Sequence, residues 1–142
     1  PLAAIETGKS HHSYPFIERT GEFGINIMDA SHADALYGCG TTSGRTVNDK
    51  FEKFGLTRLK AGQIKPPLVA ESVASLECRV CQVVDLGRPA LLIAQILSAF
   101  VDPRHFDKGA WRFDNGLQLI HHLGADDFCV SERMLTASLP LD

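Results

Sequence analysis

The chain has 142 residues, of which 44% are hydrophobic and 22% charged, and its formal net charge at pH 7 is −3. These values predict one globular domain, residues 1–142, with a hydrophobic core of ordinary size. The 14 Lys and Arg residues are spread along the chain without a basic block, which argues against nucleic-acid binding. The longest apolar stretch, residues 89–99, is too short to cross a bilayer, and no signal-peptide pattern opens the sequence. We therefore expect a cytoplasmic protein without membrane contact.

The first predicted elements are a strand, a polar turn and a short helix. Residues 1–6 are expected to form the strand, and residues 14–19 the helix, because Ser13 precedes it and Pro15 lies in its first turn. An anion such as phosphate is favoured before this helix by free N–H groups and the positive end of the helix dipole. The alternative is a solvent-exposed cap without a ligand. The side chains that add donors there are Lys9, Ser10, His11 and Ser13.

The middle of the chain is expected to hold a strand, two short helices and two irregular stretches. Residues 22–28 alternate as a strand, and residues 32–37 and 47–54 are predicted helices. The run of small residues 38–45 between these helices indicates a flexible loop. Residues 56–67 are expected to be irregular, since two consecutive prolines disfavour regular pairing. The predicted N-caps of the two helices are Ser31 and Thr46.

The clearest pattern predicts an antiparallel hairpin. Apolar and polar residues alternate over residues 74–80, a turn follows at residues 85–89, and residues 90–101 form the returning strand. Further on, Asp114 is expected to cap a last short helix over residues 115–122. Short strands dominate over short helices, so the fold is predicted to be mainly β and barrel-like.

The cysteines and the paired histidines are not expected to bind a metal. Cys78 and Cys81 have the spacing of a metal knuckle, but on a strand their side chains point to opposite faces. Free buried thiols are therefore the preferred interpretation of the cysteines. His121 and His122 would diverge by about 100° on a helix, and no carboxylate or cysteine cluster lies at ligand spacing.

Four segments match, in order, the motifs of one family. They are PLAAIETGKSHHSYPFIERTGEFGINI (strand, phosphate loop, helix and "geF.vN" strand), SGRTVNDKFEKFGL ("SGR...DKF...GL"), PPLVAESVASLECRV ("P...ea...leC.v") and LIHHLGADDF ("h.gG..Y"). They resemble the flavin reductase-like domain with an FMN-binding split barrel, specifically its flavoredoxin-like branch. Nearly the whole chain is covered.

The resemblance implies a homodimeric flavoprotein with FMN near the subunit interface. The loop matching residues 9–13 would hold the FMN phosphate, with Lys9 supplying charge and its polar neighbours hydrogen bonds. NADH or NADPH would donate a hydride, and a free flavin or a protein would accept the electrons. The flavin carries this chemistry, so no catalytic residue is assigned. The candidate cofactor-binding residues are Lys9, Ser10, His11, Ser13, Ser43, Arg45 and Lys50. For Arg45 and Lys50, contact with the dimer mate or a surface pair with Asp49 or Glu52 remains an alternative.

Three departures from the family pattern affect this expectation. The family domain normally has β structure ahead of the segment matching residues 1–6, so an N-terminally incomplete barrel with open edges is expected. Phe128 stands in place of the motif tyrosine, and residues 93–96 replace a frequent Gly-Glu-Val. A haem-binding split barrel and a cofactor-free structural or interaction module are therefore the alternatives.

Overall fold

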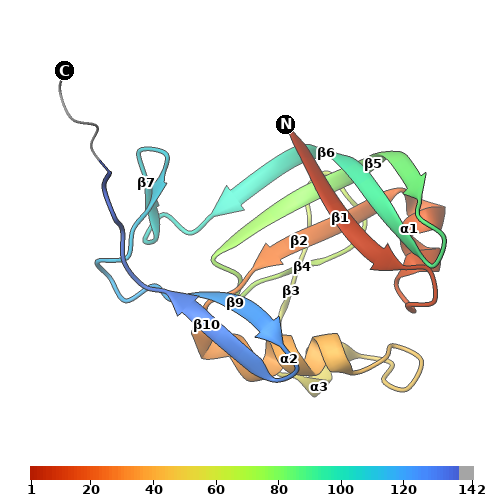
Figure 1. The fold of residues 1–142 in the computed structure, drawn as a ribbon, viewed down its shortest axis with the longest axis horizontal. Helices are drawn as coiled ribbons and strands as arrows, with labels where there is room; N and C mark the ends of the chain where they lie inside the picture. Colours follow the sequence, from red (N-terminus) through yellow and green to blue (C-terminus); the bar gives the residue numbers. More distant parts are fainter. Residues whose placement is uncertain (138–142) are drawn as a thin grey trace.

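The centre of the fold is a four-stranded antiparallel sheet with the strand order β1-β6-β5-β2. The computed structural model describes residues 1–137 (Figure 1). The strands of this sheet are β1 (Leu2–Gly8), β2 (Glu22–Ile27), β5 (Ala74–Asp85) and β6 (Pro89–Val101). The long strands β5 and β6 in Figure 1 confirm the predicted hairpin.

The sheet is curved because β5 and β6 do not keep one register. Their pairing shifts between Glu77 and Cys78, and again between Val80 and Gln82. Such bulges bend a strand and increase its twist. The result is a half-barrel in a mainly β fold with a few short helices, as predicted from the sequence (Figure 1).

One face of this sheet carries the core. Phe23 of β2, Cys78 of β5 and Ala94 of β6 form a buried cluster, and Ile5 and Ile17 pack against it. Ile17 belongs to the helix α1, so this contact holds α1 against the sheet. The polar loop that precedes α1 is thereby fixed relative to the strands.

The helices are short. They are α1 (Tyr14–Thr20), the 3₁₀ turn η1 (Ala30–His32), α2 (Ala33–Thr41) and α3 (Lys50–Lys53). α1 confirms the first predicted helix, with Pro15 in its first turn and Gly21 as a left-handed C-cap. None of the helices among the described residues has the length and apolar character needed to span a membrane.

α2 is longer than predicted and has a different cap. The helix expected over residues 32–37 continues through Gly38 to Thr41. Half of the expected flexible loop, residues 38–41, is therefore helical. Gly38 does not end the helix but lies inside it, against the ring of Phe54, where an added Cβ would come within 2.3 Å. Ser31 is not the cap of α2, because the residue before this helix is His32, which forms no side-chain capping hydrogen bond. Asp29 instead caps the preceding turn η1, where its carboxylate accepts a hydrogen bond from Ser31 N (2.9 Å).

α3 is shorter than the predicted helix over residues 47–54. Its N-cap is Asp49, whose carboxylate accepts a hydrogen bond from Glu52 N (3.1 Å). Thr46 is not the cap because its hydroxyl donates instead to Ser43 O (3.0 Å). This bond keeps the chain before α3 in a tight turn.

The region after β6 is built of hairpins, and the predicted helix over residues 115–122 is wrong. Its strands are β7 (Phe106–Asp107), β8 (Ala110–Trp111), β9 (Leu119–Gly124) and β10 (Asp127–Ser131). Strand β9 is fixed from far away in the sequence: Ala30 N donates to Gln118 O (2.9 Å), Gln118 N donates to the Asp29 carboxylate (3.0 Å), and Asp29 forms a β-bridge with Leu119.

Two short strands lie within and just after the stretch expected to be irregular. β3 (Arg58–Leu59) pairs with β4 (Leu68–Val69), and the two prolines lie in the loop between them, outside the pairing. Figure 1 shows this pair beside β2. The loop that joins β3 to β4 has a defined shape, because side chains from the main sheet hold its backbone.

Replacing Asp102 by Asn is expected to destabilise the fold in a pH-dependent way. Hydrogen bonds from the Arg104 side chain and then from Arg104 N lower the pKa of Asp102 to about 2. Because this pKa lies below the unfolded value, the stabilisation is present above about pH 4 and is lost as the pH falls through 2. Urea unfolding should show a loss of about 1 kcal/mol or less at pH 7 that disappears near pH 2. The control Asp107→Asn changes an exposed carboxyl; an equal, pH-independent loss in both variants would contradict this expectation.

Candidate functional site

Two loops that are distant in the sequence lie in contact. The first, residues 8–13, follows β1, and the second, residues 43–46, follows α2. Arg45 Nη2 donates a hydrogen bond to Ser10 O (3.0 Å). Gly44 lies against the ring of His12, where an added Cβ would come within 2.4 Å of Cδ2, so only glycine fits this approach without a shift. The family-based prediction thus placed Ser10 and Arg45 in the same site, and the structure joins them.

The first loop is a compact turn. His11 N donates to Gly8 O (2.9 Å), and Tyr14 N donates to His11 O (3.2 Å). Ser13 lies at the N-cap of α1, but its side chain forms no capping hydrogen bond. Ser13 thus occupies the N-cap position that the sequence indicates, and its hydroxyl is left for another acceptor.

The second loop is organised by Ser43. Its carbonyl oxygen accepts hydrogen bonds from Thr46 N and Val47 N (both 3.1 Å). Its hydroxyl accepts a hydrogen bond from Arg45 N (3.2 Å). These bonds fix the backbone at Arg45, so its guanidinium reaches across to the first loop.

The first loop presents donors without an acceptor in the protein. Among residues 1–137, no hydrogen bond engages the N–H groups of Ser10, His12 and Ser13, or the hydroxyls of Ser10 and Ser13. The helix α1 has seven residues, so its dipole adds little, and these N–H and O–H groups are the main donors. With the Arg45 guanidinium beside Ser10, they form a surface suited to an oxyanion.

Lys9 and Lys50 are not joined to this surface by contacts. Lys9 Nζ forms an ion pair with Asp85 at the β5–β6 turn (2.5 Å), and the hydrogen bond from Lys9 lowers the pKa of Asp85. Lys50 Nζ donates to Cys39 O in α2 (2.6 Å). Among the described residues, Asp49 pairs with Arg58 (2.7 Å) rather than with Arg45 or Lys50, so the predicted surface pair is not formed.

His12 was absent from the predicted set, although it makes the contact between the loops. Its ring packs on Gly44 and lies edge-on to Phe16 of α1, with the ring centroids 5.1 Å apart. One signal for His12 was present in the sequence: it lies inside the run that matches the phosphate loop. That signal could not separate His12 from His11.

The thiols follow the strand geometry. Cys78 is buried and Cys81 is exposed, so the expectation that they face apart is confirmed. The expectation that the cysteines are buried holds for Cys78 and is wrong for Cys81 and Cys129, which are exposed. Within residues 1–137 no group of three or more His, Cys, Asp or Glu side chains is placed to hold a metal ion.

The C-terminal histidines lie on the strand β9 and not on the predicted helix. His121 Nε2 lies 2.8 Å from Ser131 Oγ, and His122 Nε2 lies 3.1 Å from Ala125 O. The His122 ring packs on Phe128, whose ring is edge-on to Tyr37 of α2. Phe128, which replaces the motif tyrosine, thus serves to attach the last hairpin to α2.

Comparison with known proteins places this geometry in a family. Residues 1–122 match the flavin reductase like domain. The chain belongs to this family. An uncharacterized Escherichia coli protein, YddH, is 34% identical over 140 residues, which are 96% of this chain and 74% of YddH.

Solved structures of this family share the fold. An FMN-binding domain of a flavin reductase-like enzyme from Shewanella baltica superimposes with a TM-score of 0.86 at 21% identity, covering 97% of this chain and 74% of that one. A flavoredoxin from Desulfovibrio vulgaris gives 0.83 at 20% identity, with the same coverage. The predicted split-barrel family and fold are confirmed.

Proposed function

We propose that this flavin reductase-like domain binds FMN, accepts a hydride from NADH or NADPH and passes electrons to a flavin or a protein acceptor. The observation that carries the proposal is the set of donors at residues 10–13, beside the Arg45 guanidinium, that find no acceptor within residues 1–137. Membership of the family supports the flavin as the ligand. The match covers 74% of the length of the E. coli relative, whose own activity is uncharacterized. The activity is therefore proposed here from the family and the site.

The residues present fit the phosphate end of FMN. A phosphate monoester offers several acceptor oxygens and close to two negative charges at pH 7, and Ser10, Ser13 and Arg45 offer donors and one positive charge. Lys9 would add a second charge only by sharing its ammonium with Asp85. Ser43 would act on the phosphate indirectly, because its hydroxyl and carbonyl oxygens hold the backbone that carries Arg45.

FMN, when bound, supplies the hydride and electron transfer chemistry, and the protein supplies binding and orientation. The bond from Arg45 to Ser10 O keeps the two loops together, so their donors are preorganised before a ligand arrives. His11 and His12 bring ring nitrogens to the same loop. We further propose, following the family resemblance, a cytoplasmic homodimer with FMN near the interface.

The test is a visible absorption spectrum of the purified protein, recorded again after addition of excess FMN and desalting. Flavin absorbance that stays with the protein is the expected result, and NADH and NADPH oxidation are then measured in parallel. A Soret band would identify a haem-binding split barrel instead. A colourless protein that loses all added FMN would contradict the proposal and favour a structural or interaction module.

A further inference from the structure

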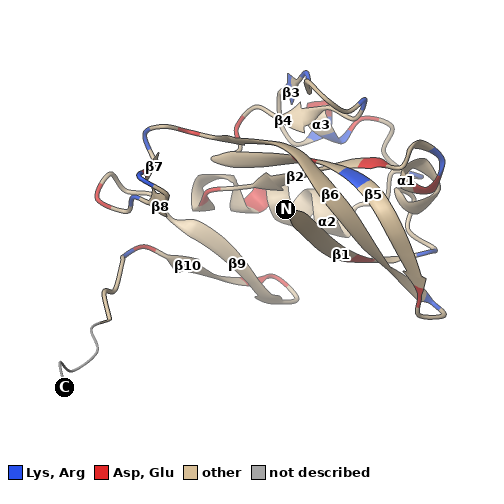
Figure 2. Cartoon of the chain, turned by 90° about the horizontal axis from the view of Figure 1, so that it is seen from above, with Lys and Arg blue, Asp and Glu red and all other residues tan. Residues whose placement is uncertain are grey.

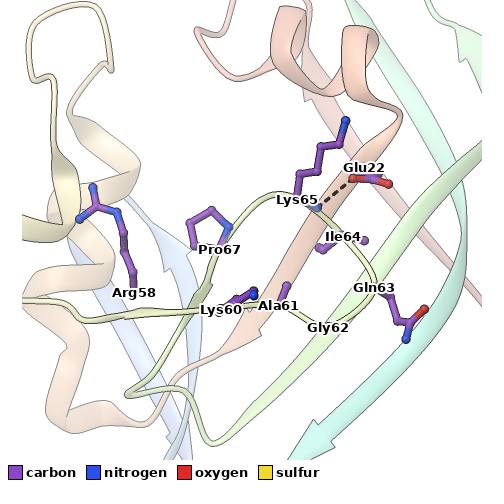
Figure 3. A pocket seen from close by; sticks show the side chains of 9 residues that line it. All are labelled: Glu22, Arg58, Lys60, Ala61, Gly62, Gln63, Ile64, Lys65 and Pro67. Carbon is purple, nitrogen blue, oxygen red and sulfur yellow. Dashed lines mark hydrogen bonds between the residues drawn. The ribbon is translucent and has the colours of Figure 1, made fainter.

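A pocket lies at the loop between β3 and β4, apart from the site described above. It has a volume of about 710 Å³ and is lined by Glu22, Arg58, Pro67 and residues 60–65 (Figure 3). Ligand pockets of proteins span roughly 300 to 1,000 Å³. None of the lining residues belongs to the two loops at residues 8–13 and 43–46, so this pocket is distinct from the proposed phosphate site.

The wall of this pocket is held by carboxylates from the main sheet. Glu77 of β5 is fully buried, and its carboxylate accepts hydrogen bonds from Gly62 N (3.0 Å), Gln63 N (2.5 Å) and Ile64 N (3.1 Å). The next amide, Lys65 N, donates to Glu22 Oε2 (2.9 Å), as Figure 3 shows. Four consecutive N–H groups are thus fixed, so a ligand would meet a formed wall and would not have to order the loop.

The pocket carries surplus positive charge. Three basic side chains line it, Arg58, Lys60 and Lys65, against the carboxylate of Glu22 in the lining and the buried carboxylate of Glu77 behind the wall. Segment 58–69 contains no Asp or Glu, although the chain as a whole has a net charge of −3 (Figure 2). Arg58 shares its charge with Asp49. Within the described part of the chain no ion pair uses Lys60 or Lys65.

The lining is also partly apolar. Ala61, Ile64 and Pro67 contribute hydrocarbon surface beside the basic side chains. An inorganic phosphate would satisfy the charges but would leave this surface and most of the volume unused. A molecule that combines two phosphates with a flat ring would contact both the basic side chains and the apolar surface. A nucleoside diphosphate has this chemistry.

We propose that this pocket binds the diphosphate and base of a nucleotide, with Lys60 and Lys65 contacting the phosphates. Two sources supply this chemistry: a free nucleoside diphosphate such as ADP, and the adenosine diphosphate half of NADH or NADPH. The second source rests on the proposed function, because it makes the pocket the binding site of the electron donor. The first source is independent of flavin chemistry.

The test is isothermal titration of the purified protein with inorganic pyrophosphate, ADP, NADH and NADPH at low ionic strength. The double variant Lys60→Gln, Lys65→Gln is compared with Lys108→Gln, which removes one charge from the exposed β7–β8 turn. We expect ADP to bind more tightly than pyrophosphate. Each pocket lysine is expected to contribute about a threefold change in affinity for both, so the double variant should bind them about tenfold more weakly. Lys108→Gln should change neither.

Retention of added FMN after desalting separates this proposal from the proposed function. The double variant is expected to retain FMN as the wild type does; a joint loss of FMN and ADP binding would overturn the second site. A rise in KM for NADH or NADPH in the double variant, with kcat unchanged, would identify the dinucleotide as the source, and binding of ADP alone the free nucleotide. The proposal would be overturned if the protein did not bind ADP, or if the double variant bound ADP as tightly as the wild type. It would also be overturned if poly-glutamate bound as tightly as ADP and lost affinity equally in the double variant.

Discussion

Replacing Glu77 by Leu is expected to lower the free energy of unfolding by about 3 kcal/mol or more. The wild-type carboxylate is fully buried and is the acceptor for the N–H groups of Gly62, Gln63 and Ile64. Leucine removes the acceptor, and a donor left unsatisfied in a buried place costs about 1 to 3 kcal/mol. Ile64 is buried, so its N–H cannot turn to water without opening the loop.

Urea unfolding at neutral pH measures this effect. The matched control is Glu71→Leu, which removes a carboxylate that accepts a hydrogen bond from a single amide, Thr57 N, at a more exposed place. We expect the control to lose about 1 kcal/mol. Glu77→Gln keeps one acceptor oxygen and should fall between wild type and Glu77→Leu. A loss below about 1 kcal/mol in Glu77→Leu would mean that the loop between β3 and β4 is hydrated rather than held by Glu77.

Replacing Arg45 by Ala is expected to weaken FMN binding by about 1.5 to 3 kcal/mol, or roughly ten- to a hundredfold. The guanidinium is the positive group that the structure places beside Ser10, and it also ties the two loops together through Ser10 O. Arg45→Lys should restore only part of the affinity, because an ammonium lacks the planar fork that contacts two acceptors at once.

Quenching of FMN fluorescence on titration with protein measures the affinity. Arg19→Ala is the control, since Arg19 is an exposed arginine at the other end of α1 whose guanidinium lies over the Phe16 ring. It should bind FMN as the wild type does. Equal affinity in Arg45→Ala and wild type would remove Arg45 from the site, and an equal loss in both variants would show a nonspecific charge effect.

The long hairpin was predictable because its information is local. Apolar and polar residues alternate along β5, and a turn separates it from an equally apolar partner, so neighbouring residues determine both strands. Strand β9 was mispredicted as a helix because the residues that fix its start are remote. Asp29 holds Gln118 and Leu119 across 89 and 90 residues, and no local pattern carries that pairing.

The helix caps show a similar competition. Thr46 and Ser31 are good N-cap residues in isolation, but α3 is capped by the Asp49 carboxylate, and α2 begins after His32 without a side-chain cap. The Thr46 hydroxyl is occupied by Ser43 O, a bond that depends on the turn beside it. Local propensity therefore located α2 and α3 within a few residues but not their caps.

For the site, the family motifs grouped residues that no local sequence pattern links. Ser10 and Arg45 are 35 positions apart, and only the order of the motifs predicted that they act together. The partner of Lys9 could not be predicted from the sequence, because Asp85 lies at the far end of β5, 76 residues away. The role of His12 depends on the close approach of Gly44, which is also a property of the folded chain.

The attachment of the last hairpin has a consequence for motion. β9 and β10 form a two-stranded sheet of their own, joined to the rest of the fold through the Asp29 region and the contact of Phe128 with Tyr37. Regions with few buried contacts open at a lower free energy than a core sheet. We therefore expect this hairpin to open at a lower free energy than the main sheet, so that it detaches and returns while β5 and β6 stay paired and the two loops around Arg45 keep their shape.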